Sequence, residues 1–186
     1  AMQYHTAGDL SKAENIYQRI LQTDPNHSGA LHLLGVISHQ AGENDRAVDL
    51  ITKALAINPG FAEAHNNLGI VLQDLGKPHE AMENYHKALA INPDYVEAYY
   101  NLGNTLKGLV WLDEAAAIYQ RALNIKPDFV QAHSNLGAAL EELGRMDEAI
   151  VHYRKAIAIN PDFAMAHNNL GNLLKKLGQL DEAVAS

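Results

Sequence analysis

The feature that most constrains the fold is a row of five prolines at one constant interval. Successive prolines are 34 residues apart, and they are Pro25, Pro59, Pro93, Pro127 and Pro161. A fixed interval of this length is typical of stacked helical hairpins, because one hairpin buries its apolar face only against its neighbours. With the proline at position 32, the complete repeats are 28–61, 62–95, 96–129 and 130–163, and partial repeats cover 1–27 and 164–186.

Other positions of the repeat are occupied in the same regular way. Position 7 is leucine, position 20 is alanine, and position 24 is tyrosine in most repeats. Position 8 is Gly35, Gly69, Gly103, Gly137 and Gly171. Glycine inside a helix costs about 1 kcal/mol relative to alanine, so its recurrence predicts that another helix approaches closely at this point.

The residues that typically end or begin helices predict two helices and no strand in each repeat. A glycine at position 15 is expected to end the first helix in a left-handed turn, at Gly8, Gly42, Gly76, Gly144 and Gly178. Asp45, Asp113, Asp147 and Asp181 follow where the second helix would need an N-cap, and Pro78 fits a helix start. Asp94 with Glu97, and Asp128 with Gln131, have the spacing of a capping box for the next first helix.

The combined pattern resembles the tetratricopeptide repeat (TPR) family. The early Leu-Gly pair, the central alanine, the tyrosine and the late proline all match that family's repeat, over essentially all 186 residues. The resemblance implies an all-α fold, a right-handed superhelical solenoid of antiparallel helix pairs in a single array. It also implies a protein that binds other proteins.

Composition narrows the function mainly by exclusion. The chain has no cysteine, 14 basic and 22 acidic residues, and no apolar run near the roughly 18 residues that span a membrane. We therefore expect no thiolate chemistry, no nucleic-acid partner, since phosphate binding needs a basic surface, and no membrane partner. No phosphate loop or metal-ligand motif is present, so we predict a non-enzymatic protein without cofactor or metal. Because the chain has no cysteine and no recognisable signal peptide, we expect a cytoplasmic location.

The candidate binding surface lies opposite the packing stripe of the first helix. Positions 2, 5, 6, 9, 12 and 13 fall there at 100° per residue, and we call this surface the asparagine face. In a TPR array it would line the inner groove. The predicted peptide-binding residues at positions 6 and 9 are Asn67, Asn101, Asn104, Asn135, Asn169 and Asn172. A second group of expected contacts is Glu63, Asp74, Glu97, Tyr100, Lys107, Glu141 and Lys175.

Carboxamides suit a peptide partner because they both donate and accept hydrogen bonds, as a peptide group does. The simpler alternative is that these asparagines are helix-compatible polar residues on a solvated face. Recurrent asparagine at position 6 is also similar to the TPR superhelix of O-GlcNAc transferase-like proteins, where such a row holds substrate polypeptides. The catalytic domain of those proteins is absent here, so the resemblance supplies no catalytic residue.

A different TPR use, the clamp for the carboxylate of a chaperone C-terminus, does not fit. Asn104 and Asn135 match its two amides, but Tyr100 stands where the clamp has lysine. Met165 and Asn169 replace its basic pair.

Two further features have a structural interpretation. His65, His133 and His167 share position 4 of the packing stripe, which favours a packing role. Val110 replaces the glycine at position 15 and is followed by Trp111, the only tryptophan. Because a β-branched residue is poorly suited to a left-handed turn, we expect a locally altered turn, with the end of the preceding helix displaced toward Gly108. The alternatives for this site are a tolerated substitution and a contact site using Trp111.

The ends interrupt helices, so we expect a fragment of a longer protein whose cut ends could promote self-association. A purely architectural or self-assembling array is the main alternative to a peptide-binding scaffold. The non-catalytic arm of a glycosyltransferase is a further alternative.

Overall fold

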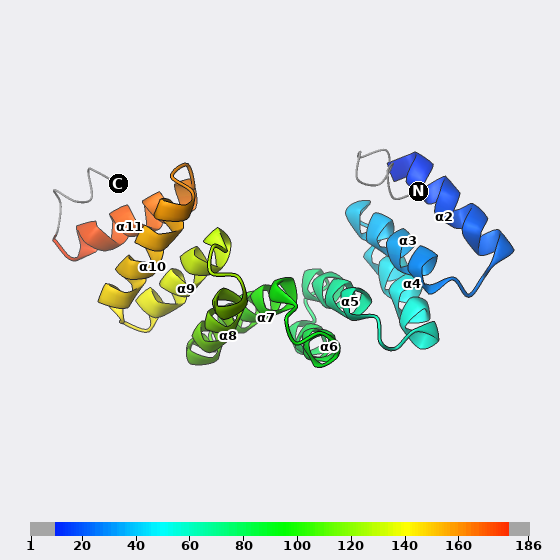
Figure 1. Cartoon of the computed structure of the whole chain (residues 1–186), viewed down its shortest axis with the longest axis horizontal. Coiled ribbons are helices and arrows are strands. Elements are labelled where there is room, and N and C mark those ends of the chain that lie inside the picture. The colour runs from blue at the N-terminus through cyan, green and yellow to red at the C-terminus, as the bar shows by residue number, and fades with distance from the viewer. Residues whose placement is uncertain (1–9, 179–186) are drawn as a thin grey trace. The chain divides into compact units, whose positions relative to one another are not determined.

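The computed structural model describes residues 10–178, which form ten α-helices and no strand (Figure 1). The chain divides into two compact units, each described by itself. The first, 1–93, contains α2 (Leu10–Thr23), α3 (Ser28–Gln40), α4 (Asn44–Ile57), α5 (Ala62–Asp74) and α6 (Pro78–Ile91). The second, 94–186, contains α7 (Val96–Gly108), α8 (Leu112–Ile125), α9 (Val130–Glu142), α10 (Met146–Ile159) and α11 (Ala164–Lys176). The expected all-α fold class is confirmed.

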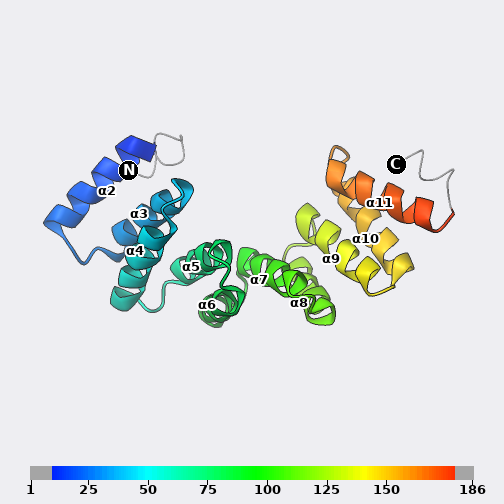
Figure 2. The same ribbon diagram turned by 180° about the vertical axis from the view of Figure 1, so that it is seen from behind.

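Each complete repeat is one helical hairpin, with a first helix of 13 residues and a second of 14. The two views in Figures 1 and 2 show α3 beside α4 in the first unit and α9 beside α10 in the second. Within a unit, consecutive first helices also touch, as α3 does with α5 and α9 with α11. Positions 1–9 and 179–186, which include Gly8 and Asp181, lie outside the described residues.

The glycine at position 8 permits a close contact between the two helices of a hairpin. A methyl group at Gly103 would lie 2.6 Å from Cε1 of Tyr119, and one at Gly137 would lie 2.7 Å from Cε1 of Tyr153. Real Cβ atoms do not approach this closely, so the tyrosine ring at position 24 occupies the space that a side chain would need. The predicted close approach is confirmed. Its partner is a tyrosine ring of the same repeat at Gly69, Gly103 and Gly137, and the side chain of Ile51 at Gly35.

The first helices end in left-handed turns, as predicted. Gly42, Gly76, Gly144 and Gly178 have φ angles between 71° and 80°. In the second unit Gly144 N donates to Glu141 O, and Arg145 N donates to Leu140 O. These two bonds satisfy carbonyls at the helix end that would otherwise lack partners.

Val110 adopts the same turn without the help of glycine. Its φ is 63°, and the amides of Val110 and Trp111 donate to Lys107 O and Leu106 O, the bonds that Gly144 and Arg145 make in the next repeat. Helix α7 ends at Gly108, at the same repeat position and with the same 13-residue length as α5 and α9, so the expected altered turn and displaced helix end are wrong. The hydrogen bonds fix the end of the helix, and the strain falls on Val110 instead.

The predicted N-caps are also wrong. Helices α4, α8 and α10 have Glu43, Trp111 and Arg145 as N-caps, and none of these side chains makes a capping bond. Asp45, Asp113 and Asp147 lie at the second helical position, where their charge faces the positive end of the helix dipole. The left-handed turn reverses the chain so tightly that the helix begins before the aspartate.

The capping boxes fail for a related reason. The N-caps of α7 and α9 are the aromatic residues Tyr95 and Phe129, which follow Asp94 and Asp128. Neither aromatic side chain makes a capping bond. The start expected at Pro78 is confirmed, because it is the first residue of α6.

The histidines at position 4 pack as predicted and join each first helix to the preceding turn. Nε2 of His65, His133 and His167 lies 3.2, 3.0 and 2.8 Å from the carbonyl oxygens of Pro59, Pro127 and Pro161. A carbonyl oxygen only accepts, so each Nε2 carries the hydrogen. The proline removes a backbone donor at the turn, and the histidine uses the carbonyl that remains.

Replacing Val110 by glycine is expected to raise the free energy of unfolding by about 0.5 to 1 kcal/mol, because relief of the left-handed strain exceeds the added chain entropy. Val110 is 70% exposed, so little apolar burial is lost. Chemical denaturation would measure the change. The matched control, Gly144→Val, should destabilise the protein, and an unchanged or lower stability of Val110→Gly would contradict the assignment of strain.

Candidate functional site

In the first unit, the asparagine face is held by contacts between successive first helices. Asn67 Nδ2 on α5 donates to Nε2 of the buried His32 on α3 at 2.8 Å. Near the other ends of the same helices, His39 Nε2 lies 2.7 Å from Asp74 Oδ2. Glu63 is exposed on α5. Asn67 and Asp74 thus belong to contacts between repeats.

In the second unit, three predicted residues form one cluster. Asn135 Nδ2 on α9 donates to Asn104 Oδ1 at 2.8 Å and to the hydroxyl of Tyr100 at 3.2 Å, both on α7. Asn104 Oδ1 also accepts from the hydroxyl of Tyr119 at 2.7 Å. The amide of Asn135 is therefore fixed in orientation, with its NH2 group turned toward the preceding repeat.

Four of the contacts between successive first helices share a separation of 35 residues. Position 5 of one repeat contacts position 6 of the next in His32–Asn67 and in Tyr100–Asn135. Position 12 contacts position 13 in His39–Asp74 and in Lys107–Glu142, whose charged atoms are 3.9 Å apart. The same face that we predicted to bind a partner also joins neighbouring first helices.

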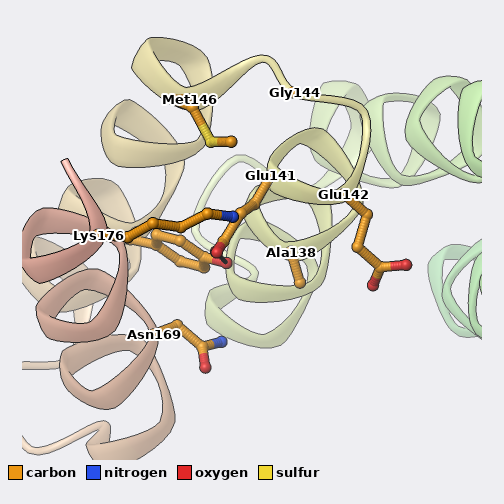
Figure 3. Close-up of a pocket in the computed structure, with 8 residues that line it drawn as sticks. Ala138, Glu141, Glu142, Gly144, Met146, Asn169 and Lys176 are labelled. Atoms are coloured by element: carbon orange, nitrogen blue, oxygen red, sulfur yellow. Dashed lines mark hydrogen bonds between the residues drawn. The ribbon is translucent and has the colours of Figure 1, made fainter.

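A pocket of about 440 Å³ opens on the asparagine face between α9 and α11 (Figure 3). Glu141 and Glu142 line it from α9, while Asn169 and Lys176 line it from α11. Figure 3 shows the Lys176 side chain extending toward Glu141, and Met146 also lines the pocket. The pocket therefore combines an amide, two carboxylates, an ammonium group and an apolar edge.

The tyrosine at position 24 connects this pocket with the core. Tyr153 is 1% exposed, and its hydroxyl donates to Glu141 Oε2 at 3.1 Å. Burial, and after it the charge of Glu141, raises the pKa of Tyr153 above its ordinary range. The hydroxyl consequently stays protonated and keeps donating to the Glu141 carboxylate.

The remaining predicted residues take simpler positions. Glu97, Asn172 and Lys175 are exposed, and Asn101 is half-buried on α7. Sequence reasoning did not name His32, His39, Tyr119 or Lys176 among the candidate site residues. The 35-residue separation between positions 5 and 6, and between 12 and 13, is the signal that could have found the first two.

A separate polar contact lies on the other side of α9. His133 Nδ1 is 3.0 Å from His152 Nδ1 on α10. His133 Nε2 donates to Pro127 O, so its Nδ1 accepts, and His152 Nδ1 must donate. Burial lowers the pKa of His133, and burial together with the charge of His133 and Lys155 lowers the pKa of His152 to about 4. Both rings are neutral at neutral pH.

Stacked helical hairpins with a polar face on their first helices define a repeat scaffold. Comparison with models of known protein families identifies which repeat family it is. Models described as tetratricopeptide repeat match residues 4–68, 62–95 and 84–115. A model described as TPR repeat matches 112–144 and 140–178. The chain belongs to the tetratricopeptide repeat family.

Solved structures agree with this assignment. A crystal structure of MamA is 30% identical, with a TM-score of 0.78 over 87% of this chain and 95% of MamA. YrrB, described as a TPR protein with an unusual peptide-binding site, is 25% identical, with a TM-score of 0.72 over 88% of this chain and 84% of YrrB. PilW, a type IV pilus biogenesis factor, is 26% identical, with a TM-score of 0.89 over 99% of this chain and 86% of PilW.

No curated protein matches the chain. Among the helices of residues 10–178, none is both long and apolar enough to cross a membrane. Within the same residues, no three histidine or acidic side chains are grouped so that they could hold a metal ion.

The histidine pair predicts a loss of stability in weak acid. In the folded protein the pKa values of His133 and His152 are lowered, so below about pH 6.5 the unfolded chain binds more protons. Because His152 is partly exposed, we expect the free energy of unfolding to be only about 1 kcal/mol lower at pH 5 than at pH 7 from this pair. Urea denaturation at both pH values would measure this.

His152→Asn should remove most of that pH dependence, whereas His86→Asn, at an exposed site on α6, should leave it in place. Equal pH dependence in the wild type and in His152→Asn would show that the pair is not the source.

Proposed function

We propose that the protein is a protein–protein interaction scaffold that binds an extended polypeptide on its asparagine face. The observation that carries the proposal is the pocket between α9 and α11, lined by Asn169 and Glu141. An amide there can pair with the N–H and C=O groups of a peptide, while the carboxylates can pair with side-chain donors. A volume of about 440 Å³ is large enough for one or two side chains of such a peptide.

The asparagines of the second unit divide into two roles in this proposal. The NH2 group of Asn135 donates to Asn104 and Tyr100, so its carbonyl oxygen can accept a hydrogen bond from an N–H group of a partner. Asn169 lines the pocket directly and can use both donor and acceptor. A fixed amide loses little conformational freedom on binding, which favours affinity.

The relatives support a scaffold and leave the partner open. YrrB is described as having a peptide-binding site, which favours peptide binding for this chain as well. We further propose that the partner is a protein and that the chain is the part of a larger protein that recruits this partner. An alternative for the larger protein is a glycosyltransferase of the O-GlcNAc transferase type. The competing proposal is an architectural array that contacts copies of itself and leaves the face empty.

Selection from a random peptide library displayed on phage would test the proposal. Peptides captured by the wild type should bind Asn169→Ala and Glu141→Ala at least about tenfold more weakly, because each loses a buried polar contact. Arg121→Ala, exposed on α8, is the matched control and should bind normally. Failure to select any peptide, or equal binding by all variants, would favour the architectural array.

A further inference from the structure

A second hollow lies in the second unit, on the side of α9 away from Asn135. His133 and Asn135 are two residues apart on α9, so their side chains point about 200° apart around the helix. The hollow has a volume of about 440 Å³ and lies between α8 and α10. Its walls include Leu123 and Ile159, and His133 with His152 forms its polar floor.

One cation lines this hollow. Lys155 lies one turn beyond His152 on α10, and its charge contributes to lowering the pKa of both His133 and His152. The exposed amide of Gln120 adds a hydrogen-bonding group from α8, and its Nε2 donates to Asn124 at 3.0 Å. The lining therefore joins apolar walls to polar nitrogen groups and one positive charge, and it contains no carboxylate.

The acidic group that acts on His152 is Glu148, which forms an ion pair with Arg145. Glu148 on α10 raises the pKa of His152, as the smallest of the four influences on that ring. Its carboxylate makes two bonds of 2.7 Å with the Arg145 guanidinium. Asp113 on α8 acts on Arg145 in turn. The carboxylates of Glu148 and Asp113 therefore interact with Arg145. The charged group that lines the hollow is the ammonium group of Lys155.

The orientation of the histidines leaves one atom suited to a ligand. His152 Nδ1 donates to His133, so in the neutral ring His152 Nε2 carries a lone pair. If Nε2 takes up a proton from solvent, it becomes a charged donor on the same side chain that lines the hollow. An anion in the hollow would stabilise that proton.

The first unit contains an equivalent arrangement of residues, with Asn84 at the position of His152. There, His65 Nδ1 lies 3.2 Å from Asn84 Oδ1, at the positions that His133 and His152 occupy in the second unit. Lys87 and Ile91 occupy the positions of Lys155 and Ile159. The amide of Asn84 cannot take up a proton near neutral pH. The first unit therefore shows which substitution of His152 removes the titrating group and keeps the hydrogen bond.

We propose that the hollow between α8 and α10 binds an apolar carboxylic acid of small-molecule size. The carboxylate pairs with Lys155 and with protonated His152, and the apolar chain packs against Leu123 and Ile159. The volume falls within the range of small-ligand pockets, about 300 to 1,000 Å³. Binding takes up one proton from solvent, at His152 Nε2, and is therefore stronger in weak acid.

The size of the pH effect follows from the two protonation states. The free ring has a pKa of about 4, and a bound carboxylate that returns it to its ordinary 6.5 makes binding about tenfold tighter at pH 5.5 than at pH 7.5. A site without a titrating group would show no such change, because the carboxylate of the ligand is ionised at both pH values.

Isothermal titration calorimetry of the full chain with octanoate tests the proposal. We expect one saturable site per chain, about tenfold tighter at pH 5.5, with proton uptake shown by the dependence of the heat on buffer ionisation. Octylamine, which has the same chain with a positive charge, should not bind. A peptide rich in glutamate and leucine is a further arm, and preference for it over octanoate would overturn the small-molecule assignment.

Two variants locate the site. His152→Asn copies the first unit and should abolish the pH dependence, and Lys155→Gln should weaken binding about tenfold at both pH values. Lys87→Gln, the equivalent change in the first unit, is the matched control. Thermal denaturation of each variant establishes that it is folded. Absence of saturable octanoate binding at pH 5.5, or equal binding by wild type and both site variants, overturns the proposal.

Discussion

The contact on which each complete hairpin depends is that between position 8 of its first helix and position 24 of its second. Glycine leaves room for a ring that a methyl group would exclude, as at Gly103 beneath Tyr119. The hydroxyl of that ring then leaves the core at the asparagine face, where it donates to Asn104, as Tyr153 donates to Glu141. In the repeats with tyrosine at position 24, this residue pair therefore determines both the helix packing and the position of polar side chains on the asparagine face.

Contacts between repeats add a second level of order. Asn135 and Asn67 each donate to a residue 35 positions earlier in the chain, within their own units. These bonds restrict side chains that would otherwise be free to rotate, so less conformational entropy is lost when a partner binds. The asparagine face can serve packing and recognition together, because an amide that donates to its neighbour still has an acceptor to offer.

The fold could be predicted almost completely from the sequence, since the 34-residue interval, the glycine turns and the helix pairs depend on local residue types. The N-caps could not, because the hydrogen bonds of the left-handed turn start α8 at Leu112, before Asp113. Val110 shows the same competition, since bonds from two amides hold a β-branched residue at positive φ. In the site, the asparagines were visible as a row, but their pairing with Tyr100 and His32 depends on distances between helices that no single repeat specifies.

Glycine at position 8 leaves room for the ring at position 24, and a double-mutant cycle in unfolding free energy tests this contact most directly. Gly137→Ala should destabilise the wild type, because the methyl group would meet the ring of Tyr153. In a Tyr153→Val background the same change should become stabilising by up to about 1 kcal/mol, since alanine is the better helix former. Equal stabilisation of both backgrounds by Gly137→Ala would show that this contact does not determine the packing of the hairpin.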